Sequence, residues 1–122
     1  AILAERLGAA AVLAIDNDDW SIENAEENIM ENNCMRIKTR KSDKIPVGTT
    51  LNIILSNINK HVLVHQMPQI GQQLAEGGVI LMSGLLQEDF EDIENEAGSC
   101  RLSVFGRMTR GNWICLKMEK SN

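Results

Sequence analysis

Three short apolar runs, each followed by polar residues and then by a stretch with helical spacing, restrict this chain to a small set of folds. The runs cover residues 12–15, 51–55 and 79–82. Short, uninterrupted apolar runs are typical of strands that are buried on both faces of a parallel sheet. Their alternation with helices predicts the α/β class, with a mostly parallel sheet and helices on both of its faces.

The stretch after the first run has the spacing of an amphipathic helix. Over residues 20–33 the apolar positions Ile22, Ala25 and Ile29 fall three and four residues apart, with acids and amides between them. This pattern predicts a helix with one buried stripe and one solvated face. A weaker strand is predicted at residues 36–40.

Two more helices are predicted after the second and third runs. Helical spacing holds over residues 63–74 but crosses Pro68, whose missing N–H should kink or restart the helix. The glycines at 77–78 should end it. Residues 83–84 are predicted to turn into the last helix, which has one apolar face over residues 86–97.

The last quarter of the chain changes character. From Leu102 to Met118, apolar residues alternate with other residues around a loop at residues 111–112. This alternation predicts a terminal antiparallel hairpin.

With 122 residues the chain is long enough for one domain. Its content of 43% hydrophobic and 24% charged residues is ordinary for a globular protein.

Composition excludes several classes of function. The longest apolar run, residues 9–15, is far shorter than the roughly 20 residues that a membrane-spanning helix needs. The net charge is −5 with scattered Lys and Arg, which argues against a nucleic-acid partner. Cys34, Cys100 and Cys115 form no C-x-x-C pair, so we expect a reducing, cytoplasmic setting.

Polar residues stand where the predicted parallel strands end, at Asp16, Asn57 and residues 83–84. Ligands of open parallel sheets bind beyond these ends. A carboxylate at Asp16 could accept two hydrogen bonds from a ribose diol, but it could equally be an acid that caps the next helix. Asn57 has the same alternative, since asparagine is favoured at a helix N-cap.

Four segments, taken in order, resemble the class I methyltransferases that use S-adenosylmethionine. They are Ala-Ile-Asp-Asn-Asp at 14–18 with the helix after it, Ile-Leu-Ser-Asn-Ile-Asn at 54–59, the glycine-led run at 77–84, and Asn-Trp at 112–113. The chain is most similar to the PrmA type, which methylates protein eleven of the large ribosomal subunit. The resemblance implies a Rossmann-like sheet with a C-terminal antiparallel hairpin.

The resemblance also implies roles for individual residues. Asp16 matches the acid that binds the ribose hydroxyls of S-adenosylmethionine, and Asn57 matches the asparagine that lies beside the transferable methyl and the incoming amine. Asp43 falls in a loop where the family often contacts the adenine. The implied substrate is an amine, a lysine side chain or an N-terminus, of a large-subunit ribosomal protein. Ile-Asn at 58–59, where other groups have Pro-Pro-aromatic, counts against nucleic-acid adenine as a substrate.

Residues 1–122 are therefore interpreted as a catalytic methyltransferase domain that is incomplete at its N-terminus. The family's first strand and glycine-rich motif are absent, and in the family sheet that strand lies between those ending at Asp16 and Asn57. Two strand edges would be left unpaired. We accordingly expect that this chain alone neither folds well nor methylates.

Two alternatives remain open at this stage. The first is a fragment of an NAD-dependent oxidoreductase with Asp16 as the ribose acid, and the second is a non-catalytic remnant of the methyltransferase fold. The methyltransferase hypothesis requires an adenosyl group to lie across a crevice bordered by the Asp16 carboxylate and the Asn57 carboxamide.

Overall fold

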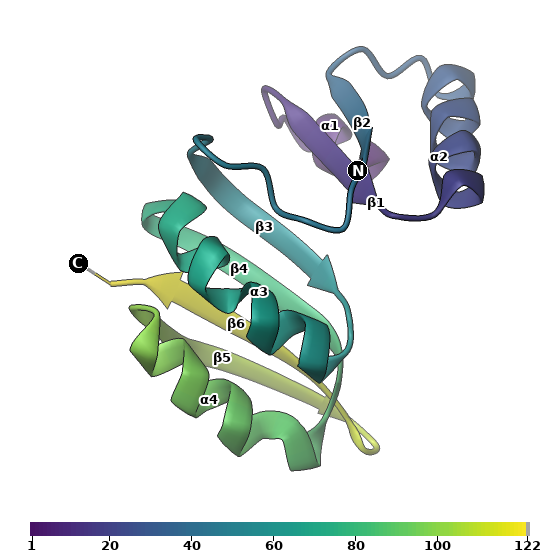
Figure 1. Ribbon diagram of the computed structural model, residues 1–122. Coiled ribbons are helices and arrows are strands. Elements are labelled where there is room, and N and C mark those ends of the chain that lie inside the picture. Colours follow the sequence, from purple (N-terminus) through teal and green to yellow (C-terminus); the bar gives the residue numbers. More distant parts are fainter. Residues whose placement is uncertain (122) are drawn as a thin grey trace. The chain divides into compact units, whose positions relative to one another are not determined.

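Two sheets form the framework of the structure, a computed structural model that describes residues 1–121 (Figure 1). A two-stranded sheet, β1-β2, belongs to a unit of residues Ala1–Lys44. A four-stranded sheet in the order β3-β4-β6-β5 belongs to a unit of residues Ile45–Asn122. Within the described residues, β1 and β3 are both edge strands.

The first unit contains one parallel pair of strands and two helices. Its elements are α1 (Ile2–Arg6), β1 (Val12–Asp16), α2 (Asp19–Glu31) and β2 (Ile37–Lys41). Ile22, Ala25 and Ile29 of α2 are all half-buried, which confirms the predicted stripe. The carboxylate of Glu5 accepts the backbone N–H of Arg36, and this contact fastens α1 to the segment that leads into β2.

The prediction that β1 is buried on both faces is wrong. Its apolar residues are only half-buried up to Ala14, and Ile15 is 38% exposed. Within the described residues the strand has a single neighbour in its sheet, so no second hydrogen-bonded strand encloses it there.

The second unit holds the larger sheet and the predicted hairpin. Its elements are β3 (Leu51–Asn57), α3 (Lys60–Gln73), β4 (Leu74–Leu86), the 3₁₀ turn η1 (Gln87–Asp89), α4 (Phe90–Ser99), β5 (Leu102–Arg110) and β6 (Trp113–Lys120). β3 and β4 run parallel, while β6 runs antiparallel to both β4 and β5. The terminal antiparallel hairpin is therefore confirmed.

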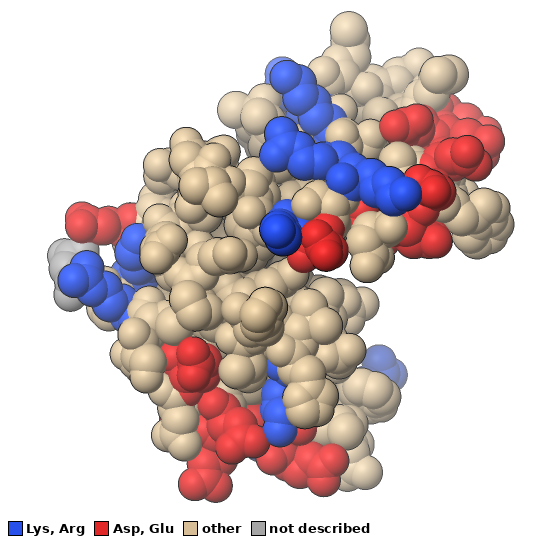
Figure 2. All heavy atoms as spheres, in the orientation of Figure 1, with Lys and Arg blue, Asp and Glu red and all other residues tan. Residues whose placement is uncertain are grey.

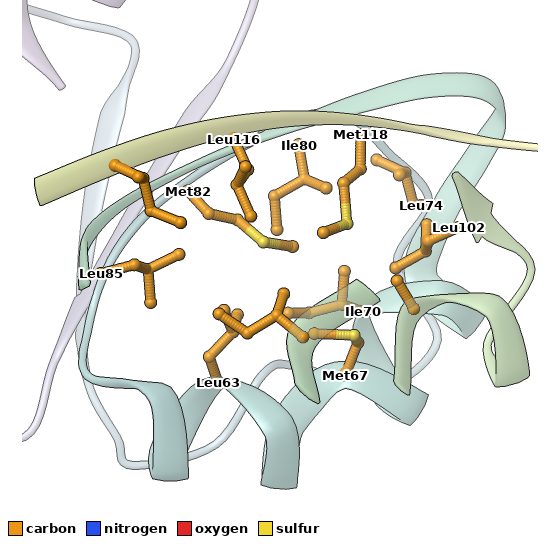
Figure 3. Close-up of a cluster of buried hydrophobic side chains, with 13 residues drawn as sticks. Leu63, Met67, Ile70, Leu74, Ile80, Met82, Leu85, Leu102, Leu116 and Met118 are labelled. Atoms are coloured by element: carbon orange, nitrogen blue, oxygen red, sulfur yellow. The ribbon is translucent and has the colours of Figure 1, made fainter. Parts of the chain in front are cut away.

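Both helices of this unit pack on the same face of its sheet, around one apolar core (Figure 3). Leu63, Met67 and Ile70 of α3 and Ile93 and Ala97 of α4 are fully or almost fully buried. The sheet contributes the remaining buried side chains, which are Leu74, Ile80, Met82, Leu85, Leu102, Ile114, Leu116 and Met118.

Within this unit, both helices cover one face of the sheet, and the helices expected on its other face stay a prediction. Ile54 packs against the core, whereas its neighbours Ile53 and Leu55 point to the opposite face and are 67% and 63% exposed. In a strand, successive side chains alternate between the two faces, so a continuous apolar run leaves every second residue on the face that the helices of this unit do not cover.

β4 is much longer than predicted, and three boundaries move with it. α3 continues through Pro68 without restarting and ends at Gln73, so Leu74 already belongs to the strand. The glycines at 77–78 lie inside β4, where residues 75–78 bulge out between the partners of Leu51 and Ile53. Residues 83–84 also remain in the strand, which ends only at Leu86.

Candidate functional site

Asp16 is the last residue of β1, and its side chain is not the cap of the following helix. Its Oδ1 accepts the backbone N–H of Asp18 at 3.0 Å. The N-cap of α2 is Asp18, whose Oδ2 accepts the backbone N–H and the hydroxyl of Ser21, both at 2.9 Å. These hydrogen bonds hold the pKa of Asp18 below its ordinary value. The bond from the backbone of Ser21 has the larger effect, and the bond from its hydroxyl comes second. Asp16 is solvent-exposed, and only its Oδ1 is engaged within the described residues.

Asn57 ends β3 in the same way and is likewise not a cap. The N-cap of α3 is Asn59, whose Oδ1 accepts the backbone N–H of Val62 at 3.0 Å. In the part of the chain that the structure describes, the carboxamide of Asn57 makes no hydrogen bond. At both strand ends, a second polar residue two positions later caps the helix.

The carboxamide of Asn57 lies against a bulge in β4. Met82 pairs with Leu116 and Leu85 with Ile114, so two residues of β4, Ser83 and Gly84, face one residue of β6. Gly84 has a φ of +77°, and a Cβ atom there would overlap Oδ1 of Asn57. The sequence placed residues 83–84 at a strand end but gave no sign of this contact.

Asp43 lies in the bend after β2, and its side chain is exposed. The backbone N–H of Ser42 donates to the carbonyl oxygen of Asp16 at 2.9 Å, so the segment that carries Asp43 is joined to the end of β1. Ser42 also shapes the bend, since its hydroxyl oxygen accepts the backbone N–H of Lys44 at 3.0 Å. The first unit thus brings Asp16 and the Asp43 segment to one edge of its sheet. Asn57 belongs to the second unit, and the crevice between Asp16 and Asn57 stays a prediction.

Acidic side chains gather over α4 (Figure 2). Lys60 of α3 reaches this surface, and its Nζ lies 2.9 Å from Oδ2 of Asp92 and 3.8 Å from Oδ1 of Asp89. The hydrogen bond to Asp92 raises the pKa of Lys60. The surface over α4 is therefore predominantly negative and offers little to a phosphate backbone.

Three further findings concern the described residues only. Cys34, Cys100 and Cys115 are all free thiols. Residues 1–121 contain no group of three or more His, Cys, Asp or Glu side chains arranged to hold a metal ion. None of the helices described is both long and apolar enough to cross a membrane.

Solved structures share this arrangement of strands and helices. A ribosomal protein L11 methylase from Lactobacillus delbrueckii subsp. bulgaricus matches all of this chain and 64% of its own, with a TM-score of 0.94 and 31% identity. A methyltransferase from Pyrococcus furiosus matches 99% of this chain and 68% of its own, with a TM-score of 0.82 and 21% identity, and so supports the fold alone. The fold is the Rossmann-like fold of the class I methyltransferases.

The particular family follows from sequence comparison. The model of the ribosomal protein L11 methyltransferase (PrmA) family matches residues 1–121, and the chain belongs to this family. The ribosomal protein L11 methyltransferase of Porphyromonas gingivalis is 35% identical over 119 residues, which are 96% of this chain and 41% of the relative. That of Thermosipho melanesiensis is 38% identical over 97% of this chain and 43% of its own length. The chain thus spans about two fifths of these relatives. Family membership decides against the oxidoreductase alternative.

Proposed function

We propose that this chain carries the cofactor ribose site and the amine-orienting group of a methyltransferase that acts on ribosomal protein L11. One observation supports this above the others. Asp16 and Asn57 stand at strand ends, and the helices after them are capped by Asp18 and Asn59 instead. Oδ2 of Asp16 and the carboxamide of Asn57 accept no hydrogen bond within the described residues, and we propose that they are available to a ligand.

Asp16 is proposed to bind the ribose of S-adenosylmethionine. A carboxylate accepts hydrogen bonds through two oxygens, and Oδ1 of Asp16 is already oriented by the N–H of Asp18. This bond fixes the side chain at the end of β1 and leaves Oδ2 to accept from a sugar hydroxyl. Asp43, whose segment is joined to the end of β1, is proposed to contact the adenine.

Asn57 is proposed to act where the methyl group is transferred. S-adenosylmethionine supplies, when bound, a methyl group on an activated sulfonium. The chain's own task is then alignment, because an in-line displacement depends on the direction from which the amine arrives. The carboxamide oxygen of Asn57 can accept an amine hydrogen, and so can turn the nitrogen lone pair towards the methyl carbon.

The proposed substrate is an amine of the ribosomal protein, a lysine side chain or the N-terminus. Residues 58–59, Ile-Asn, depart from the Pro-Pro-aromatic segment of methyltransferases that act on nucleic-acid adenine. The acidic surface of α4 also disfavours direct binding of nucleic acid. We place the reaction in the cytoplasm, in keeping with the three free thiols.

A chimera tests the proposal. In this chimera the matched region of the Porphyromonas gingivalis relative, 119 residues, is replaced by this chain. We expect it to transfer labelled methyl groups from S-adenosylmethionine to purified ribosomal protein L11, and the variant Asn57→Ala to lose at least about tenfold in kcat. Asn52→Ala, an exposed asparagine in the same strand, is the matched control. A folded chimera without transfer activity would support the non-catalytic alternative instead.

A further inference from the structure

Two glycines of β4 have almost the same backbone conformation but different surroundings. Gly77 has a φ of +74° and Gly84 a φ of +77°, both in the left-handed region that favours glycine. A Cβ atom at Gly77 would have no heavy atom within 4 Å. A Cβ atom at Gly84 would overlap Oδ1 of Asn57, with Cγ of Asn57 at 3.6 Å and the carbonyl oxygen of Ile58 at 3.7 Å. At Gly84, then, the space of the missing side chain is filled by the carboxamide of Asn57.

The bulge of β4 brings this backbone to the carboxamide. Asn57 is the register partner of Ser83, the first residue of the bulge. The Ser83 hydroxyl also lies 3.5 Å from the carbonyl oxygen of Ser56, at the upper limit of a hydrogen bond. Such bulges bend a strand locally and can redirect a neighbouring side chain. Here the bend places Gly84 over the last side chain of β3.

The orientation of the Asn57 side chain depends on packing, whereas that of Asp16 is fixed by a hydrogen bond. Oδ1 of Asp16 is fixed by the N–H of Asp18 at 3.0 Å. The Asn57 side chain makes no hydrogen bond within the described residues, so the surface beside it is what limits its rotamers. The backbone of Gly84 is part of that surface.

We propose that Gly84 is a positioning residue, which sets the direction of the Asn57 carboxamide by letting it pack where a Cβ atom would otherwise stand. The inference rests on the proposed function of Asn57. According to this inference, the bulge in β4 determines how the amine-binding carboxamide of Asn57 is oriented. Any side chain at position 84 would displace the carboxamide from the end of β3.

A double-variant cycle of thermal unfolding in the chimera tests the contact without using activity. Gly77→Ala and Gly84→Ala both force an alanine into the left-handed region, so both should lower Tm. Gly84→Ala should lower it by about 1–2 °C more than Gly77→Ala does, because the end of the exposed Asn57 side chain must also move. This excess should vanish in the background of Asn57→Ala. Equal losses for both variants, unchanged in that background, would overturn the inference.

A spectroscopic measurement separates positioning from a general loss of structure. In ¹⁵N-labelled protein, the side-chain NH₂ resonances of Asn57 should shift in Gly84→Ala and stay in place in Gly77→Ala. Assignment comes from their disappearance in Asn57→Ala. If these resonances stay in place in both alanine variants, the side chain is not held by Gly84 and the inference is wrong.

Kinetics of the chimera distinguish failure of this inference from failure of the proposed function. With wild-type transfer present, Gly84→Ala should lower kcat at least about tenfold, whereas Gly77→Ala should retain it. Transfer that survives Gly84→Ala unchanged would overturn the positioning role and leave the proposed function standing. A chimera without any transfer would refute the proposed function, while the Tm cycle and the resonances would still decide the contact.

Discussion

The carboxylate of Asp16 accepts the backbone N–H of Asp18 at 3.0 Å, and Asp18 in turn caps α2. Two acids separated by one residue therefore divide two tasks between them. The first is the candidate ligand-binding group, and the second stabilises the helix that follows it. Substitution of Asp16 should therefore affect ligand binding, whereas substitution of Asp18 should affect the stability of α2.

Asp16→Asn is expected to leave the stability of the chain nearly unchanged. The asparagine keeps an oxygen that can accept the N–H of Asp18, and Asp16 forms no ion pair within the described residues. Thermal unfolding followed by circular dichroism should give a Tm within about 2 °C of the wild type. A much larger drop would show that Asp16 serves mainly to stabilise the first unit.

Asp18 is expected to make the first unit sensitive to acid. Its pKa is lowered in the folded chain by the hydrogen bonds from Ser21, first of all that from the backbone. A group with a lowered pKa stabilises the fold fully above its unfolded pKa, and this contribution is lost as the pH falls through the folded value. Helix content should therefore decline as the pH falls below about 4. Asp18→Asn keeps a capping oxygen but does not titrate, so its decline should be smaller. An identical acid profile for both proteins would contradict the role of Asp18.

Replacement by alanine should cost more stability at Asn59 than at Asn57. Asn59 caps α3 through Val62, so Asn59→Ala should lower the free energy of unfolding by about 1 kcal/mol. Asn57 makes no hydrogen bond among the described residues, and Asn57→Ala should cost clearly less. Chemical denaturation of the two variants measures both values. The reverse order would identify Asn57 as the structural residue of the pair.

The two faces of the larger sheet predict different costs for the same substitution. Leu63 is fully buried in the core beneath α3, and Leu63→Ala should lower the free energy of unfolding by about 2–5 kcal/mol. Leu55 is 63% exposed, and Leu55→Ala should cost less than about 1 kcal/mol. Denaturant titration of the chimera and its two variants checks both values. Comparable losses would show that the Leu55 face is also covered in solution.

Much of the fold could be predicted because helices and hairpins have local patterns. Such patterns indicate which side of an element is buried. Examples are the helical stripe of Ile22, Ala25 and Ile29 and the strand alternation from Leu102 to Met118. The burial of the strands could not be predicted in the same way. Continuous apolar runs are alike whether one face or two are covered, and Ile53 and Leu55 are exposed although they continue the run of Ile54.

The candidate site was only partly predictable, for two physical reasons. Aspartate and asparagine are favoured both at helix caps and at ligand sites, so composition could not decide between Asp16 and Asp18 or between Asn57 and Asn59. The structure assigns the caps to Asp18 and Asn59. The contact of Asn57 with Gly84 depends on the bulge where β4 pairs with β6. Such a bulge depends on how two strands pair, and the local sequence does not predict it.

Calorimetric titration of S-adenosylhomocysteine into the chimera tests the central claim most directly. The account predicts saturable binding that weakens at least about tenfold in Asp16→Asn. Asp19→Asn, an acid of the same segment that pairs instead with Lys41 at 2.8 Å, should bind as the wild type does. Equal affinity for the wild type and Asp16→Asn, or no binding by a correctly folded chimera, would contradict the claim that this chain holds the ribose.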